Sequence, residues 1–206
     1  TQKQTARDRL QFDSVRHVYT LDGMRIPSVT QVIDPLLPYG VIPKEVRQEA
    51  LLRGELVHKL TEMLDSRGLD EETILDAHTG GLLGYIRAWD KFKHDFDANI
   101  EAIELRVLHV GWRYAGTVDR ILRRDGRPAL LEIKTGTLLP ESQLQTAAYM
   151  LAYNELLPID FRIHRRFVVQ LGDDESYHVE EHTDKADFDV FKAALTISNW
   201  RLRYAP

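Results

Sequence analysis

Residues 115–136 read AGTVDRILRRDGRPALLEIKTG, which is two apolar runs joined by a charged turn. Asp125-Gly126 is a strong signal for a two-residue hairpin turn. A turn centred there places Asp119 directly opposite Glu132, because the pairing register follows from the turn. Opposed side chains have Cβ atoms only about 5 Å apart. The hairpin therefore predicts two carboxylates side by side.

The same register fixes the neighbours of these two acids. Lys134 lies two residues beyond Glu132 and emerges on the same face, whereas Leu131 and Ile133 point into a core. Two adjacent carboxylates repel, and one pKa rises unless a cation lies between them. Oxygen ligands suit Mg²⁺ or Mn²⁺, and Lys134 can hold a water or neutralise a phosphate. This combination indicates phosphodiester hydrolysis. A solvated face, with Lys134 in an ordinary salt bridge, remains the alternative.

Composition narrows the class of protein. The 206 residues predict one compact domain, and 43% hydrophobic with 29% charged residues is an ordinary globular balance. There is no cysteine, which excludes disulfides, cysteine-ligated zinc, iron–sulfur clusters and thiol nucleophiles and fits a cytoplasmic protein. We expect no membrane span and no signal peptide. A net charge of −5 means that any nucleic-acid contact needs a local basic patch.

Periodicity predicts a mixed α/β fold. An N-terminal hairpin turns at Asp22-Gly23, and a short helix capped by Ser28 or Thr30 follows it and stops before Pro35. Two amphipathic helices, three strands, a helix, two strands and a closing helix come next. The first two helices are expected over 43–64 and 82–96, and the three strands over 100–110, 113–122 and 128–134. The next helix is expected over 140–157, the last two strands over 161–171 and 176–182, and the closing helix over 185–204.

Four motifs in order resemble the PD-(D/E)xK nuclease superfamily, in its RecB-like and phage exonuclease branch. They are RGELVH with His58, GTVDRI with Asp119, LEIKTG with Glu132 and Lys134, and QTAAY from Gln145 to Tyr149. The resemblance spans about residues 50 to 170. It implies a restriction-endonuclease-like core of helix, three-strand meander, helix and strand. We expect one nuclease domain over 1–206, with a hairpin and short helix in 1–48, a catalytic core in 49–170 and a strand and helix in 171–206.

The resemblance also assigns roles. It implies that Asp119, Glu132 and the Ile133 carbonyl ligate one or two Mg²⁺ or Mn²⁺ ions, with His58 as a ligand or the partner of one. Lys134 is implied to orient the attacking water. The same resemblance implies that Gln145 and Tyr149 position the metal site or the DNA strand. No iron–sulfur cluster is expected.

Further side chains are candidates for contact with DNA, each with a structural alternative. Arg53 and Arg120 are the arginines most suited to bind phosphate, although many arginines form only a solvated surface. Ser28 and Thr30 offer a phosphate site or a plain helix cap. Glu104, flanked by apolar residues in a predicted strand, either lines the site or faces outward; the outward reading is slightly preferred.

The sequence thus predicts a metal-dependent deoxyribonuclease, an exonuclease of recombination, repair or DNA processing, from a phage or its bacterial host. The alternatives are a structure-selective endonuclease and a non-catalytic DNA-binding or assembly protein with the nuclease fold. The expected partner is DNA that is single-stranded or has single-stranded ends, with no membrane. A recombination or annealing protein and further copies of the chain are open as additional partners.

Overall fold

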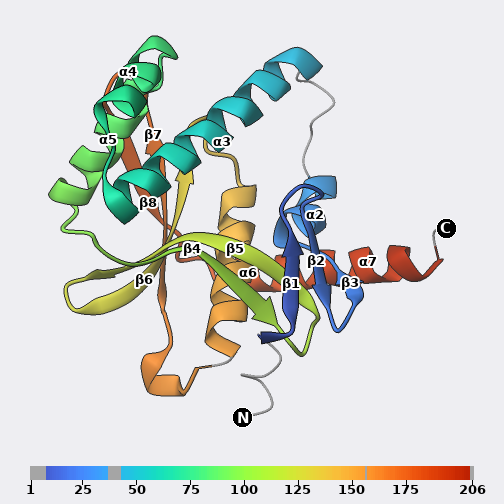
Figure 1. Ribbon diagram of the computed structural model, residues 1–206. Coiled ribbons are helices and arrows are strands. Elements are labelled where there is room, and N and C mark those ends of the chain that lie inside the picture. The colour runs from blue at the N-terminus through green and yellow to red at the C-terminus, as the bar shows by residue number, and fades with distance from the viewer. Residues whose placement is uncertain (1–7, 37–42, 156, 205–206) are drawn as a thin grey trace.

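The centre of the molecule is a five-stranded sheet in the order β4-β5-β6-β7-β8 (Figure 1). The computed structural model describes residues 8–36, 43–155 and 157–204. Neighbouring strands are antiparallel except for β6 and β7, which are parallel. The strands are β4 (Asn99–His109), β5 (Tyr114–Arg124), β6 (Arg127–Lys134), β7 (Arg165–Leu171) and β8 (Tyr177–Glu181). The predicted mixed α/β class is confirmed.

The β5–β6 hairpin has the register that the sequence predicts. Leu122 pairs with Ala129, and the ladder continues inward to Arg120 opposite Leu131. Asp125 and Gly126 have φ angles of 51° and 72°. Positive φ at both central residues is the requirement of the tight turn that matches strand twist. Local turn chemistry therefore sets which residues meet at the far end of the hairpin.

Helices cover both faces of the sheet (Figure 1). One face packs against α3 and α5 through a core that includes Val57, Trp89 and Leu131. The other face packs against α2, α6 and α7 through a core that includes Tyr149 and Phe191. The helices are α2 (Val29–Ile33), α3 (Lys44–Arg67), α4 (Glu71–Thr79), α5 (Leu83–Asp95), α6 (Glu141–Glu155) and α7 (Ala186–Tyr204). Within the described ranges, no helix has the length and apolar character needed to cross a membrane.

A small N-terminal sheet packs beside the start of β5. It consists of β1 (Leu10–Asp13), β2 (Val18–Leu21) and β3 (Met24–Ile26), with the expected turn at Asp22-Gly23. Tyr19 Oη and Thr117 Oγ1 share a hydrogen bond of 2.7 Å between this sheet and β5. Its last residues lead into α2, which Ser28 caps, and so the hairpin is anchored at both ends.

Some element boundaries differ from the prediction. The strand expected over 161–171 begins only at Arg165, because Ile159–Phe161 forms a 3₁₀ turn, η3. The Asn154 side chain also bonds both the N–H and the C=O of Ile163, at 2.8 and 2.7 Å, and keeps them out of the ladder. The short helix ends at Ile33, and Asp34–Leu36 continues as a 3₁₀ turn, η1. Residue 156 of the helix expected over 140–157 lies outside the described residues.

Gly116 allows β5 to approach α6 closely. A Cβ atom at this position would lie 2.4 Å from Cε1 of Tyr149. We expect Gly116→Ala to lower the free energy of unfolding by about 1–3 kcal/mol, the usual cost of overpacking a core. Urea denaturation followed by circular dichroism measures the change.

The control is Gly54→Ala in α3. There a new Cβ would lie 3.7 Å from Thr135 Oγ1, an ordinary contact. Alanine is favoured over glycine inside a helix by up to about 1 kcal/mol, so this variant should be as stable as the parent or more so. Equal stability of Gly116→Ala and the parent would contradict the close approach.

Candidate active site

The regular pairing of β4 and β5 is interrupted at Glu104 and Asp119. Ile103 pairs with Arg120 and Leu105 with Val118, on either side of them. Glu104 has a φ of 46°, in the left-handed region that a non-glycine residue rarely adopts. Such local strain gathers at functional sites. The interruption therefore marks this point of the sheet as unusual before any chemistry is considered.

Asp119 joins β5 to β6 through its side chain at the same point. Its Oδ2 accepts a hydrogen bond of 2.7 Å from the Ile133 N–H. The Asp119 N–H donates in turn to Glu132 Oε1 at 3.4 Å. Both carboxylates are almost fully buried, at 7% and 1% exposure. The two acids are therefore neighbours, as the hairpin register indicates, but they are linked through side chains instead of a backbone ladder.

Three possible metal ligands converge beside Asp119. One ligand atom each from His58 on α3, Glu104 on β4 and Asp119 on β5 lies within 4.8 Å of the others. His58 Nδ1 is 3.5 Å from Asp119 Oδ1. Two carboxylates and an imidazole, with no thiolate, suit a divalent ion such as Mg²⁺ or Mn²⁺ better than structural zinc.

For Glu104 the sequence leaves two alternatives, a place in the site or an outward-facing position, and slightly favours the second. The structure turns Glu104 towards His58 and Asp119. A lone acid between Ile103 and Leu105 was the available signal. That signal did not tell on which face of the sheet the Glu104 side chain lies. Successive side chains of a strand normally alternate between the faces, and the left-handed φ that changes this at Glu104 cannot be inferred from the sequence. Glu132 lies outside this group of three.

Burial and mutual repulsion disturb the acids of the site. Burial, with the charge of Asp119, raises the pKa of Glu104 to about 8. Burial and the same charge raise the pKa of Glu132 well above its usual range, and Lys134 opposes the shift. A raised carboxyl pKa means that negative charge is incompletely compensated by the protein alone. A divalent cation bound here would supply the missing compensation.

Lys134 is held beside these acids by two side chains. Its Nζ donates to Gln145 Oε1 at 2.8 Å and lies 3.4 Å from Glu132 Oε2. Gln145 Nε2 donates to Tyr149 Oη at 3.1 Å, one turn further along α6. Burial, with the charge of Glu132, raises the pKa of Tyr149, which therefore stays a neutral phenol. The chain from Tyr149 to Gln145 fixes the position of the Lys134 amine.

The assignment of Arg120 to DNA binding is wrong. Its side chain is fully buried, and its Nε donates to Asp65 Oδ2 at 2.8 Å on α3. The guanidinium also bonds Thr61 Oγ1 and the Asp119 carbonyl and lies over the Trp89 ring. A buried cation needs such partners, and here they consume its donors. Arg120 joins α3 and α5 to the sheet and does not reach the surface.

Ser28 also has a structural role. It is 2% exposed, and its Oγ accepts the Gln31 N–H at 3.1 Å while the Gln31 side chain returns to the Ser28 N–H. This reciprocal pair is a capping box. Thr30 is exposed, and its hydroxyl bonds Ser28 Oγ at 3.0 Å. Arg53 is half-buried on α3, and its Nε has no hydrogen-bond partner within the described residues.

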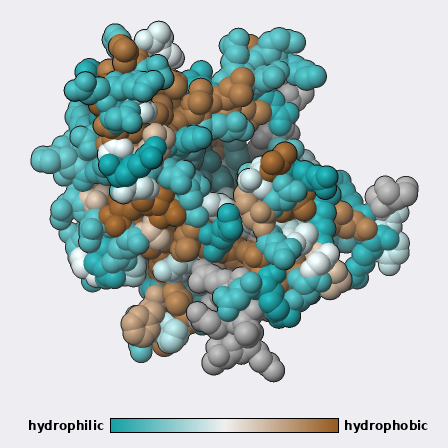
Figure 2. All heavy atoms as spheres, in the orientation of Figure 1, coloured by the Kyte–Doolittle hydropathy of each residue, from teal (hydrophilic) through white to brown (hydrophobic). Residues whose placement is uncertain are grey.

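The surface is hollowed between α3 and the β1–β3 sheet (Figure 2). These two elements flank the strands that carry Glu104 and Asp119, since α3 supplies His58 and Tyr19 of β2 bonds Thr117. His58 and Glu104 are each about one-third exposed, at 29% and 33% of their side chains. The acids are thus buried on the protein side and open towards solvent on one side.

Metal affinity should rise with pH. Below about pH 8 Glu104 holds a proton that a metal ion must displace, and above it the carboxylate is already free. In metal-free protein the raised pKa of Glu104 contributes to the stability of the fold. This contribution is complete below pH 4.5, the usual pKa of the group, and is lost as the pH rises to about 8. Calorimetric titration of EDTA-treated protein with Mg²⁺ between pH 6 and 9 measures the effect. Glu104→Gln should flatten it, and a pH-independent affinity in the parent would refute the link.

Arg120→Met should destabilise the protein by about 3–5 kcal/mol, because it removes the buried guanidinium from Asp65 and leaves Lys93 as the remaining cation beside that carboxylate. Denaturant unfolding checks this. The variant should leave the salt dependence of DNA binding unchanged, because the guanidinium contacts no solvent. A variant of parental stability with a shallower salt dependence would restore Arg120 as a DNA contact.

Comparisons with known proteins find similar folds and one family model. A presumed exonuclease from Eubacterium rectale has a TM-score of 0.55 at 10% identity, covering 85% of this chain and 79% of that chain. The alkaline exonuclease LHK-Exo from Laribacter hongkongensis has a TM-score of 0.41 at 14% identity, covering 98% of this chain and 96% of that chain. No curated protein matches. The model of the PD-(D/E)XK nuclease superfamily matches residues 44–196, most of the chain, and the chain belongs to this superfamily.

Proposed function

We propose that this chain is a metal-dependent deoxyribonuclease that hydrolyses phosphodiester bonds, acting as an exonuclease. The observation that carries the proposal is the placement of one amine beside one acidic cluster. Lys134 Nζ is held between Glu132 and Gln145, and the ligand atoms of His58, Glu104 and Asp119 lie within 4.8 Å of one another next to it. Metal ligands and a fixed amine are the parts that phosphodiester hydrolysis needs.

His58, Glu104, Asp119 and Glu132, with the Ile133 carbonyl, would hold one or two Mg²⁺ or Mn²⁺ ions. The bonds already made limit which oxygens remain available. Asp119 Oδ2 accepts the Ile133 N–H, so Oδ1, which faces His58, is the oxygen left for a metal. A bound divalent ion polarises the phosphate and lowers the pKa of a bound water.

The three remaining residues of the site position the reacting groups or support one another. Lys134 orients the attacking water or neutralises the phosphate, and its two hydrogen bonds keep the amine in one place. Gln145 accepts from Lys134 and donates to Tyr149, which fixes the orientation of its amide. Tyr149 is a neutral phenol against Gly116, and so it supports Gln145 without adding charge to an acidic site.

The exonuclease assignment rests on resemblance. The motifs resemble the RecB-like and phage exonuclease branch, and two of the similar folds are described as exonucleases. We infer 5′-phosphate products and a role in recombination, repair or DNA processing in a cytoplasmic compartment, with residues 1–206 acting as one nuclease domain. DNA with single-stranded ends is the proposed substrate, and a recombination partner or further copies of the chain are proposed partners. A structure-selective endonuclease is the second candidate.

The test uses end-labelled DNA, single- and double-stranded, linear and circular, with Mg²⁺ or Mn²⁺. We expect linear DNA alone to be degraded, and EDTA to abolish degradation. Lys134→Ala should lower kcat about 10²- to 10⁴-fold, the usual contribution of a positioned proton-transfer group. The matched control is Lys91→Ala, an exposed lysine on α5, which should leave kcat unchanged.

Other outcomes separate the alternatives. Cutting of circular DNA assigns an endonuclease. Failure of well-folded protein to cleave any of these substrates with either metal rejects the enzymatic proposal and favours a non-catalytic DNA-binding protein. The label pattern on linear DNA gives the polarity of digestion.

A further inference from the structure

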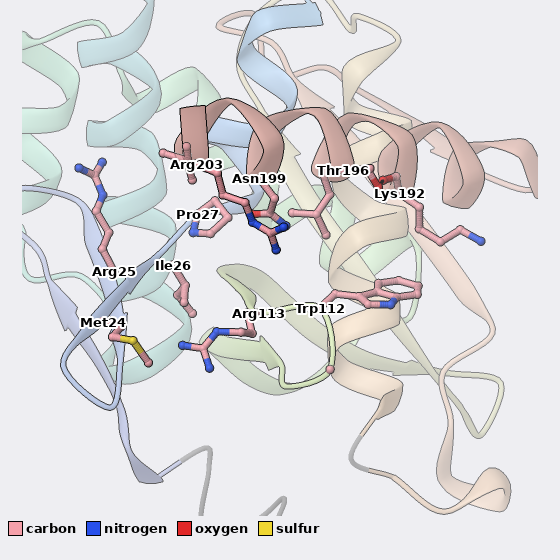
Figure 3. Close-up of a pocket in the computed structure, with 13 residues that line it drawn as sticks. Met24, Arg25, Ile26, Pro27, Trp112, Arg113, Lys192, Thr196, Asn199 and Arg203 are labelled. Atoms are coloured by element: carbon pink, nitrogen blue, oxygen red, sulfur yellow. Dashed lines mark hydrogen bonds between the residues drawn. The ribbon is translucent and has the colours of Figure 1, made fainter. Parts of the chain in front are cut away.

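A second, basic region lies away from the acidic cluster. It is a groove of about 910 Å³ between β3, the turn joining β4 to β5, and the second half of α7 (Figure 3). Four cations line it: Arg25, Arg113, Lys192 and Arg203. None of its lining residues, all of them in the described part of the chain, is Asp or Glu. In a chain of net charge −5, such a groove is a local reversal of sign.

Three of the four cations have no partner in the part of the chain that the structure describes. Arg25, Arg113 and Arg203 form no hydrogen bond or ion pair among the described residues, and only Lys192 is paired, with Asp189 at 2.6 Å. Several arginines elsewhere on the surface are paired. The examples are Arg9 with Asp22, Arg87 with Glu175, Arg123 with Glu101 and Arg165 with Glu181. Unpaired guanidinium groups gathered in one groove are suited to an anion from outside the chain.

The β4–β5 turn presents its side chains in a fixed arrangement. Glu155 of α6 accepts the Gly111 N–H at 3.0 Å. The Trp112 N–H donates to His109 Nδ1 at 3.1 Å, and the two rings stack with centroids 4.3 Å apart and an interplanar angle of 5°. Trp112 nevertheless stays 39% exposed. An aromatic ring that is already ordered loses little conformational entropy when a further ring stacks on it.

We propose that this groove binds a single-stranded segment of the DNA substrate, at a distance from the reacting end. Arg203 points from α7 towards the turn, Arg113 points towards β3 beside Met24, and Trp112 with Lys192 lies further along the same groove (Figure 3). The guanidinium groups neutralise phosphates, and Trp112 stacks on a base. Base stacking on an aromatic ring combined with backbone cations is how single strands are bound without sequence preference. The proposal rests on the proposed function, because it takes DNA as the substrate.

The position of the groove predicts a dependence on strand length. Arg113 lies six positions before Asp119, and β5 connects them. At about 3.3 Å per residue of strand, they are about 20 Å apart. A stacked strand that rises about 3.4 Å per nucleotide needs about six nucleotides to span this distance, and an extended single strand needs fewer. An oligonucleotide too short to span it occupies one place at a time.

The experiment measures binding without cleavage. Fluorescein-labelled dT4 and dT20 are titrated by anisotropy in EDTA, at several salt concentrations, with the parent and with Arg113→Asn/Arg203→Gln. Asparagine is chosen at position 113 because the φ there is 53°, which asparagine tolerates. We expect dT20 to bind at least 10-fold more weakly to the variant. The slope of log K against log salt should fall by about 1.4, since each lost phosphate contact removes about 0.7.

The matched control is Arg87→Gln/Arg165→Gln, which removes two arginines that are paired within the chain. It should leave the affinity and slope for dT20 close to the parent values. The dT4 oligonucleotide, which offers fewer phosphates, should bind the parent more weakly than dT20. Equal losses for the two double variants, or no binding of dT20 by the parent, would overturn the proposal.

Trp112→Phe gives a second readout. It keeps an aromatic ring against His109, so the turn is retained, while quenching of tryptophan fluorescence by dT20 should shrink. Unchanged quenching would refute stacking at Trp112. Poly-glutamate of matched charge should bind poorly; if it binds as tightly as dT20 and loses as much affinity in the arginine variant, the groove serves an acidic protein partner and the proposal fails. Because EDTA prevents cleavage, binding can succeed here even if the proposed hydrolysis is not found.

Discussion

The site depends on one hydrogen bond, from the Ile133 N–H to Asp119 Oδ2 at 2.7 Å. The backbone pairing of β5 and β6 ends just before it, at Arg120 and Leu131. A buried N–H left without an acceptor costs about 1–3 kcal/mol. The Asp119 carboxylate takes the place of a backbone carbonyl as acceptor for the Ile133 N–H, and the same bond holds the carboxylate in position. Through this bond the sheet brings Asp119 against Glu132 and, two residues on, Lys134.

The residue that follows Asp119 is equally constrained. Along β5, Val118 and Ile121 pack into the core on the α6 side, whereas Leu122 packs on the α3 side and Arg120 bonds Asp65 of α3. Strict alternation would not give this arrangement, so the faces shift where the ladder to β4 is interrupted. Since α3 also carries His58, the Arg120–Asp65 pair fixes the helix that delivers a nitrogen to 3.5 Å from Asp119. Arg120 is thus a positioning residue for the site.

Much of this was predictable from local rules, and the exceptions have physical reasons. Asp125-Gly126 determined the hairpin register, and helical spacing placed Gln145 and Tyr149 on one face of α6. Glu104 was not predictable as a neighbour of His58, since its φ of 46° depends on the surrounding packing. Arg120 was misassigned because sequence shows a cation next to a site residue but not the buried Asp65, 55 positions away, that pairs with it. Local turn and helix chemistry was readable; long-range charge compensation was not.

Unpaired charge distinguishes the two regions to which function is assigned here. Around Glu104 and Glu132 the carboxyl groups are buried next to Asp119, and burial together with that negative charge raises the pKa of both. In the groove the unpaired charge is positive, with three guanidinium groups unpaired among the described residues. A folded chain pairs its buried and crowded charges unless something outside completes them. On the functions proposed above, a divalent cation would complete the first region and a phosphate backbone the second. A DNA strand held at its phosphates while one end met a bound metal ion would satisfy both at once.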